Sequence, residues 1–172
     1  MTLAKEIITN FFQQKGEPAH FDQLFEATIS ELAHQNALAV DIFLEKENQF
    51  ASETERLLES LFEQRDFLQR VGGGTASLDT GIWWLTQPGQ TEPPLIDRLE
   101  QIVVRHLIQN SETTSRDVKM AAYEALPGIF TPGHDDLLNC LESYGDLIDP
   151  DSHLWRLRES DQPASQIGRA HV

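Results

Sequence analysis

Apolar residues recur at every third or fourth position through the first third of the chain, which is the period of one face of an α-helix. The pattern predicts helices over 3–16 and 21–35, followed by a third helix that starts at Ser52. Gly16 suits the end of the first helix, because glycine readily adopts the left-handed conformation needed there. Residues 37–50 fit either a helix or a partly extended segment. The buried face of the third helix is expected to carry Leu57, Leu58, Leu61 and Phe62.

After the third helix the period changes from helical to alternating. Residues 66–71 and 81–85 are predicted to form a hairpin, joined by a flexible loop over 72–80 that contains three consecutive glycines. Neighbouring side chains of a strand point to opposite faces of the sheet. We therefore expect Trp83 in the core and Trp84 on the other face, where it is partly exposed.

A proline-rich stretch, TQPGQTEPP, interrupts the pattern and predicts a linker over 89–93. Helical spacing resumes in three further segments, and a second, shorter hairpin follows. We expect Thr114 or Ser115 to cap the middle helix and Thr131 to cap the last one, with Pro132 at its first position. The helical segments are 94–110, 113–128 and 131–145, and the hairpin is 146–157.

The second half of the chain repeats the first. ERLLESLFEQRDFL (55–68) aligns without a gap with DDLLNCLESYGDLI (135–148), and the Trp-x-Leu that begins at Trp83 then corresponds to the one that begins at Trp155. Each half thus runs helix, helix, helix, strand, loop, strand, which is the order of a winged helix. The alternative is a chance likeness between two leucine-rich helices.

The expected fold is therefore mainly α with small β-hairpins (α+β), arranged as a tandem winged-helix repeat. With 172 residues, 40% of them hydrophobic, the chain can bury one moderate core or two small ones. We place the two domains at 1–88 and 94–160. The end of the chain, 161–172, is small and polar and is expected to be a disordered tail.

The net charge of the chain weighs against some classes of function. The chain carries 13 Lys and Arg against 28 Asp and Glu, a net charge of −15, and both halves are acidic. This balance repels phosphate backbones at long range and weighs against indiscriminate binding of nucleic acid. The single cysteine, Cys140, excludes an internal disulfide, and no apolar run approaches the roughly 18 residues of a membrane span. With no apolar leader at its start, the protein is expected in the cytoplasm and away from membranes.

The third helix of each half is the element that would enter a major groove, where Arg, Lys, Asn and Gln match base edges and phosphates. In the first half it offers Arg56 and Arg65 among several glutamates, and in the second it offers an asparagine among acids and no base. The hairpins carry three further candidates, Arg70, Arg156 and Arg158. These five arginines are the candidate nucleic-acid contacts. The alternative for the hairpin arginines is an ordinary solvated strand edge.

No residue set points to catalysis, a metal or a cofactor. The glycine run at 72–74 is followed by a strand, whereas a phosphate-binding loop needs a helix and a lysine. The six histidines show no close pair at metal-ligand spacing, and Cys140 has no evident His/Asp pairing, so we expect it to be an inert core thiol. We therefore predict that the protein is not an enzyme and uses no cofactor. The partly exposed Trp84 is instead a candidate contact for a protein partner.

Three stretches of the second half, PPLIDRLEQIVVRHL, LPGIFTPGHDDLLNCLESYG and WRLRESDQPASQ, carry a family resemblance. Their Pro-Leu-x-Asp-Arg-x-Glu helix start, their Thr-Pro before a helix and their Leu-x-Ser-Tyr close resemble the C-terminal region of large predicted bacterial DNA methyltransferases, over residues 93–165. The catalytic Asp/Asn-Pro-Pro-Tyr/Phe motif and the glycine-rich cofactor strand of such enzymes do not occur in the 172 residues. The resemblance therefore implies an accessory role, with methyl transfer carried out by another chain or segment.

Two functions remain open. In the first, the protein is a non-catalytic interaction module, accessory to a DNA-modification or phage-defence complex, and its acidic surface meets a basic partner such as a DNA methyltransferase or another DNA-processing subunit. In the second, it is a winged-helix transcriptional regulator, a dimer that reads double-stranded DNA through the hairpin arginines and the first of the two third helices. The net charge favours the first function, in which binding to DNA is weak. Assembly into a homo-oligomer is compatible with both.

Overall fold

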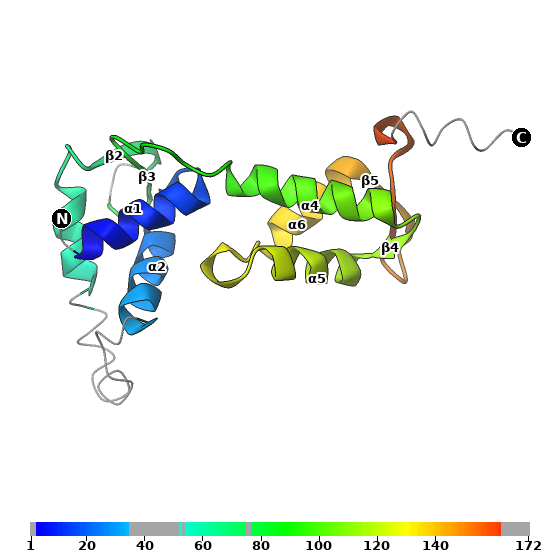
Figure 1. The fold of residues 1–172 in the computed structure, drawn as a ribbon, viewed down its shortest axis with the longest axis horizontal. Coiled ribbons are helices and arrows are strands. Elements are labelled where there is room, and N and C mark those ends of the chain that lie inside the picture. Colours follow the sequence, from blue (N-terminus) through cyan, green and yellow to red (C-terminus); the bar gives the residue numbers. More distant parts are fainter. Residues whose placement is uncertain (1–2, 35–51, 53, 75–76, 163–172) are drawn as a thin grey trace, which may run out of the picture. The chain divides into compact units, whose positions relative to one another are not determined.

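The computed structural model describes residues 3–34, 52, 54–74 and 77–162 (Figure 1). In this part the chain is a mainly helical α+β protein, with six helices and two small antiparallel sheets of three strands each. The predicted fold class is confirmed at this level. The chain divides into two compact units with the boundary between Pro94 and Leu95, which we call unit 1 and unit 2. The ambiguous segment 37–50 and the last ten residues of the predicted tail, 163–172, lie outside the described residues.

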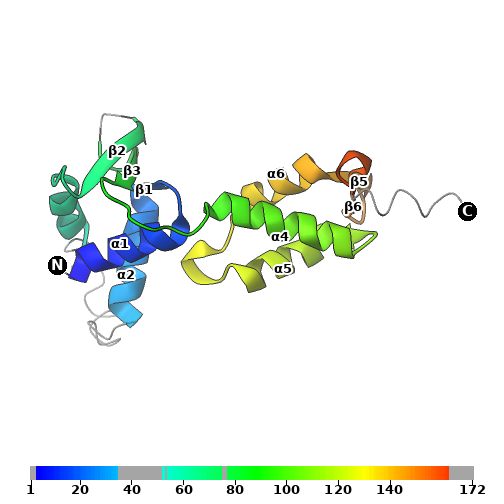
Figure 2. The ribbon, with the colours of Figure 1, turned by 45° about the horizontal axis from the view of Figure 1, so that its top comes forward.

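In its described residues, unit 1 contains three helices and a sheet with the strand order β1-β3-β2 (Figure 2). The predicted hairpin is present as β2 and β3. The strand β1 was not predicted, because a strand of two residues is too short to show an alternating pattern of apolar and polar positions. The elements are α1 (Leu3–Lys15), β1 (Ala19–His20), α2 (Phe21–His34), a third helix that includes residues 54–62, β2 (Leu68–Gly73) and β3 (Gly81–Leu85).

The end of α1 lies at Gly16, as predicted. Its backbone has φ +75°, and its N–H donates to the carbonyl of Phe12 at 2.9 Å. A Cβ atom at this position would lie 2.2 Å from the carbonyl oxygen of Glu92, because the chain that follows β3 passes directly over the turn. Glycine is therefore required both by the left-handed conformation and by the close approach of a second backbone segment.

The two tryptophans of β3 lie on opposite faces of the strand, as predicted. Trp83 is 6% exposed, and its ring lies 4.4 Å from the ring of Phe62 on the third helix. Trp84 is half-buried and meets the ring of Phe12 on α1 edge to face, with 5.2 Å between the ring centres. One strand thus contacts two different helices of unit 1.

The third helix of unit 1 buries a narrower face than the sequence suggested. Leu58, Leu61 and Phe62 are buried, whereas Leu57 is 38% exposed, so its predicted burial is wrong. Position 57 is four residues from Leu61, but it lies at the edge of the buried face, whose centre is set by Thr54, Leu58, Leu61 and Phe62.

Unit 2 has three helices and a sheet with the strand order β4-β6-β5. Its core joins the inner faces of the helices to Trp155 and Leu157 of β6, and Cys140 lies within it at 3% exposure, as predicted. The elements are α4 (Leu95–Gln109), β4 (Thr113–Thr114), α5 (Ser115–Ala125), the 3-10 turn Gly128–Phe130, α6 (His134–Tyr144), β5 (Gly145–Asp149), β6 (Leu154–Leu157) and the 3-10 turn Glu159–Asp161.

One of the two predicted helix caps of unit 2 is correct. Thr114 caps α5, since its hydroxyl oxygen accepts from the backbone N–H of Asp117 at 3.2 Å. The predicted cap of α6 at Thr131 is wrong, because Thr131 instead closes the preceding 3-10 turn through an N–H donated to Gly128 at 3.1 Å. The helix begins at His134, and its cap is Gly133 with no side-chain bond.

The two sheets share their strand order and their register at tryptophan. Trp83 pairs with Ala19 and Arg70, and Trp155 pairs with Thr113 and Leu147. In both hairpins the pairing register also shifts directly after the partner of the tryptophan, between Arg70 and Gly72 in unit 1 and between Leu147 and Asp149 in unit 2.

The gapless alignment of the halves is nevertheless wrong in the strands. Leu68 lies opposite Leu85 and Gly145 lies opposite Leu157, so Leu68 corresponds to Gly145. Ile148, which the alignment matched with Leu68, is 40% exposed, whereas Leu68 is 1% exposed. The chain between the third helix and the strand is longer in unit 1, where residues 63–67 intervene, than in unit 2, where α6 runs directly into β5.

Candidate functional site

The exposed face of α6 is acidic. Its inward residues are Leu137, Cys140 and Leu141, and this spacing turns the intervening positions to solvent. The helix sequence HDDLLNCLESY contains no Lys or Arg. Exposed on it are His134, Asp135, Asp136, Asn139, Glu142 and Ser143.

The third helix of unit 1 has a mixed exposed face. Arg56 is exposed on it, between Glu55 and Glu59, and Arg65 is exposed in the turn that follows the helix. The guanidinium groups of these two arginines make no hydrogen bond or ion pair within the part of the chain that the structure describes. They remain able to contact a partner.

Arg70 is held in place by its own hairpin. It lies half-buried on β2 with its guanidinium carbon 5.2 Å from the centre of the Trp83 ring, and its Nη2 donates to the carbonyl of Ser77 in the loop. A Cβ atom on Gly81 would lie 2.6 Å from both Nε and Nη2 of Arg70, so glycine at position 81 makes room for the guanidinium. The main role of Arg70 is therefore to fasten the loop to the core tryptophan.

Arg65 and Arg70 are the two candidates of unit 1 that the structure brings together. Both line a hollow of about 500 Å³, whose walls also include Glu63 and Trp83. Glu63 places a carboxylate beside the two arginines, so this surface is less positive than the two cations alone suggest.

Arg158 is partly exposed, but its guanidinium makes structural contacts within unit 2, so it differs from a solvated strand-edge residue. Its Nη1 donates to the carbonyl of Ser143 at 3.0 Å, and its Nη2 donates to the carbonyls of Glu142 at 2.9 Å and Gly145 at 3.4 Å. Carbonyls at the end of a helix lack intrahelical donors and form the negative end of the helix dipole. Arg158 supplies both a donor and a positive charge to the end of α6.

Arg156 matches the description of a solvated strand-edge arginine. It is exposed on β6 between the buried Trp155 and Leu157, and its side chain has no hydrogen bond or ion pair among the described residues. Of the five candidate arginines, Arg70 and Arg158 therefore have structural contacts, whereas the guanidinium groups of Arg56, Arg65 and Arg156 have no partner in the described part of the chain.

Trp84, the candidate protein contact, is less available than an exposed anchor would be. Its half-buried ring packs against Phe12, so part of its surface contributes to the core of unit 1. Replacing Trp84 by alanine would therefore change stability as well as any contact with a partner.

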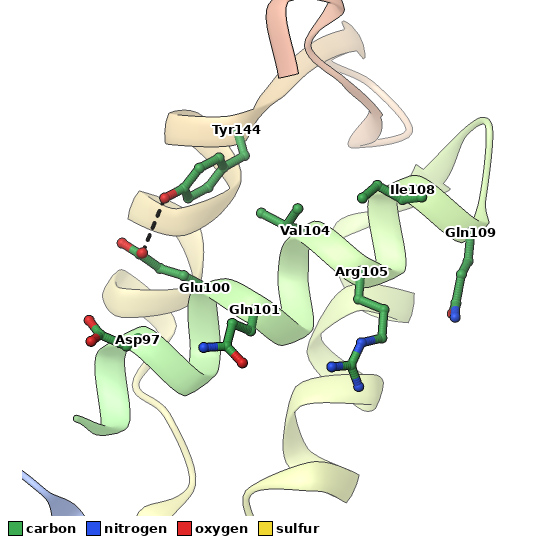
Figure 3. A pocket seen from close by; sticks show the side chains of 8 residues that line it. All are labelled: Asp97, Glu100, Gln101, Val104, Arg105, Ile108, Gln109 and Tyr144. Atoms are coloured by element: carbon green, nitrogen blue, oxygen red, sulfur yellow. Dashed lines mark hydrogen bonds between the residues drawn. The ribbon is translucent and has the colours of Figure 1, made fainter. Parts of the chain in front are cut away.

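A groove that the sequence did not indicate runs along the outer side of α4 (Figure 3). We call it the α4 groove, and its volume is about 750 Å³. At one wall the hydroxyl of Tyr144 donates to a carboxylate oxygen of Glu100 at 3.1 Å, which joins α6 to α4. The residues that line it are Asp97, Glu100, Gln101, Val104, Arg105, Ile108, Gln109 and Tyr144.

The carboxylate of Glu100 contributes to the raised pKa values of two nearby residues, Tyr144 and Cys140. The hydrogen bond to Glu100 and the charge of its carboxylate raise the pKa of Tyr144. Burial raises the pKa of Cys140 to about 11, and the charges of Glu100 and Asp136 add to that effect. At neutral pH Cys140 is therefore a protonated, unreactive thiol, which agrees with its place in the core.

The sequence shows a clear apolar pattern for only one face of α4, so the α4 groove on the other face was not predicted. The strong stripe of Leu99, Val103 and Leu107 is buried, as expected for the inner face. A weaker stripe on the opposite face, with Val104 half-buried and Ile108 37% exposed, lines the groove. The spacing of that second stripe was the available signal.

Comparison of the chain with protein-family models, with curated proteins and with solved structures finds no match. Within the described residues, no three or more His, Cys, Asp and Glu side chains are grouped so that they could hold a metal ion. No helix in the described ranges combines the length and the apolar character needed to cross a membrane.

Proposed function

We propose that the protein is a non-catalytic interaction module made of two winged-helix units, which serves a bacterial DNA-modification or phage-defence complex through contacts with another protein. The repeated order of helices and strands, the common strand order of the two sheets and the matching pairing of Trp83 and Trp155 support the winged-helix repeat. The resemblance of the second half to the C-terminal region of predicted DNA methyltransferases supports the kind of complex.

The observation that carries the proposal is the acidic exposed face of α6. In a winged helix that reads DNA, the third helix enters the major groove and needs donors for phosphates and base edges. Here it presents Asp135, Asp136 and Glu142 without a Lys or Arg. Such a face is repelled by phosphate and is attracted to a basic protein surface.

A second function, DNA binding, is favoured by the three candidate arginines whose guanidinium groups have no partner within the described residues. Arg56 and Arg65 are exposed at and after the third helix of unit 1, and Arg156 is exposed on the hairpin of unit 2. Three cations can neutralise only a few phosphates, so this function predicts weak, salt-sensitive binding unless base contacts add to it.

A fluorescence-anisotropy titration with a random duplex, at low and at moderate salt, tests the proposal. We expect binding weaker than the ~10⁻⁴–10⁻⁶ M of ordinary non-specific binders, because fifteen net negative charges oppose the approach of DNA. The matched variant replaces Arg56, Arg65 and Arg156 by Glu, which leaves the structural Arg70 and Arg158 intact. Micromolar or tighter binding with a steep salt slope, lost in this variant, would replace the proposal by the DNA-binding function.

A further inference from the structure

Helix α4 carries two stripes of side chains on opposite faces. Leu99, Val103 and Leu107 enter the core of unit 2, while the positions 97, 101, 104 and 108 line the α4 groove. The intervals of the second stripe are four, three and four residues, which is the spacing of the contact seam in a coiled coil. Val104 and Ile108 give this seam an apolar half.

Opposite charges flank the seam on its two sides. Glu100 lies on the side of Tyr144, and Arg105 lies on the other side, as their directions in Figure 3 show. Glu100 accepts one hydrogen bond, from Tyr144, and a carboxylate has room for several more. Arg105 is exposed, and its side chain forms no hydrogen bond or ion pair with the described part of the chain. Both groups can therefore pair with a charge outside this unit.

We propose that the α4 groove binds the α4 groove of a second copy of this chain, with Glu100 of each copy opposite Arg105 of the other. A two-fold interface requires a surface that complements itself. A negative and a positive group on the two flanks of one seam meet this requirement, since two identical ion pairs form at once. Flanking charges of this kind select the partner of a coiled-coil seam.

A second copy fits the α4 groove better than a uniformly basic segment does. A basic segment would satisfy Asp97 and Glu100 but would place its own cations against Arg105. A copy of α4 sets Arg105 against Glu100 on both flanks of the seam and covers Val104 and Ile108 with the same apolar pair, while the second acid, Asp97, lies at the exposed start of the helix. Each copy has a net charge of −15, but at physiological ionic strength charges more than about 8 Å apart are largely screened, so the groups in contact decide the association.

Sedimentation equilibrium on the full chain at 0.15 M salt, from about 1 to 200 μM, tests the inference, and the range brackets the micromolar affinity of a small interface. We expect a reversible dimer. Glu100→Lys alone and Arg105→Glu alone should each weaken it by about tenfold or more, because each places two like-charged pairs in the interface. The double variant, which exchanges the two charges, should restore the dissociation constant to within about threefold of the original.

Three further variants separate the interface from the fold of unit 2. Ile108→Asp should also weaken the dimer, whereas Met120→Asp, on α5 at 62% exposure, should not. Tyr144→Phe removes the hydrogen bond to Glu100 but keeps its charge, so the dimer should persist. Circular dichroism of each variant should match that of the original protein, and it is the check that each variant is folded.

A monomer at every concentration would overturn the inference, as would single variants without effect or a double variant whose loss equals the sum of the two singles. The inference is independent of the proposed function, because the anisotropy titration is read on duplex DNA and does not depend on whether the chain is a monomer or a dimer.

Discussion

Removing the guanidinium of Arg158 should loosen the end of α6 and its junction with β5. Arg158→Ala deletes two hydrogen bonds of good length, to Ser143 at 3.0 Å and Glu142 at 2.9 Å, and a longer one to Gly145 at 3.4 Å. Each good bond contributes about 0.5–1.5 kcal/mol, and a cation at a helix C-terminus adds about 0.3–1 kcal/mol. The ion pair with Asp146 at 3.5 Å adds almost nothing, since both side chains are more than 40% exposed.

Because the Arg158 side chain is 42% exposed, we take the lower part of these ranges and expect a loss of about 1–2 kcal/mol in the free energy of unfolding of unit 2. For a unit of this size, that loss lowers the melting temperature by roughly 5–10 °C. Thermal unfolding followed by circular dichroism gives the total effect. Hydrogen exchange measured peptide by peptide assigns it, since the last turn of α6 and β5 should exchange faster while unit 1 stays unchanged.

Arg156→Ala is the matched control for this prediction. Arg156 lies two residues earlier, on β6, is exposed and has no partner among the described side chains, so its loss should change the free energy of unfolding by less than about 0.5 kcal/mol. Arg158→Lys keeps the charge but not the forked geometry and should fall between the two. Equal effects of the alanine variants at 156 and 158 would refute the structural role of Arg158.

Three further predictions follow from single contacts. Gly81→Ala should destabilise unit 1 by about 1–3 kcal/mol in urea unfolding, because the new methyl group meets both the guanidinium of Arg70 and the indole nitrogen of the buried Trp83 at 2.6 Å, whereas an unchanged midpoint would show that both side chains move aside freely. Cys140, buried and with its pKa raised to about 11, should react with a thiol reagent at pH 7.5 only when denaturant is added, and rapid labelling of the folded protein would contradict its buried place. The pKa of Asp117 is lowered chiefly by the hydrogen bond from Thr114, so its stabilising contribution is present above about pH 4 and is lost as the pH falls through the lowered pKa. Asp117→Asn should therefore flatten the acid limb of the unfolding profile, and an identical limb in the variant would refute the assignment.

Local pattern determined much of the architecture. Helical spacing predicted the helices, and glycine at position 16 predicted the end of α1, because the left-handed turn is a property of one residue. Alternation placed Trp83 and Trp84 on opposite faces of β3, because the pleat of a strand has a period of two. The cap of α5 at Thr114 also came from a local bond, between a hydroxyl and an N–H three residues later.

The sequence-based predictions were wrong where the local pattern allowed two structures and contacts with other residues decided between them. Thr131 could cap α6 or close a 3-10 turn, and its backbone joins the turn. Leu57 and Leu58 are adjacent leucines, and only the packing of the helix against the sheet decided that Leu58 is buried. The gapless alignment failed because strand register follows from the pairing of Leu68 with Leu85 and of Gly145 with Leu157, which sequence similarity does not record.

The sequence by itself determined the classes of side chain available for function: an acidic surface, few arginines, no recognisable catalytic set and a buried cysteine. Only the tertiary structure decided what each arginine does, since Arg70 rests on Trp83 and Arg158 binds the end of α6, while Arg156 has no partner within the described ranges. It also placed Tyr144 of α6 beside the outer stripe of α4, which contains Val104 and Ile108, and so formed the α4 groove. The physical reason is that a charge or an apolar residue is read from composition alone, whereas its partner lies on another element, and contacts between elements exist only once the chain has folded.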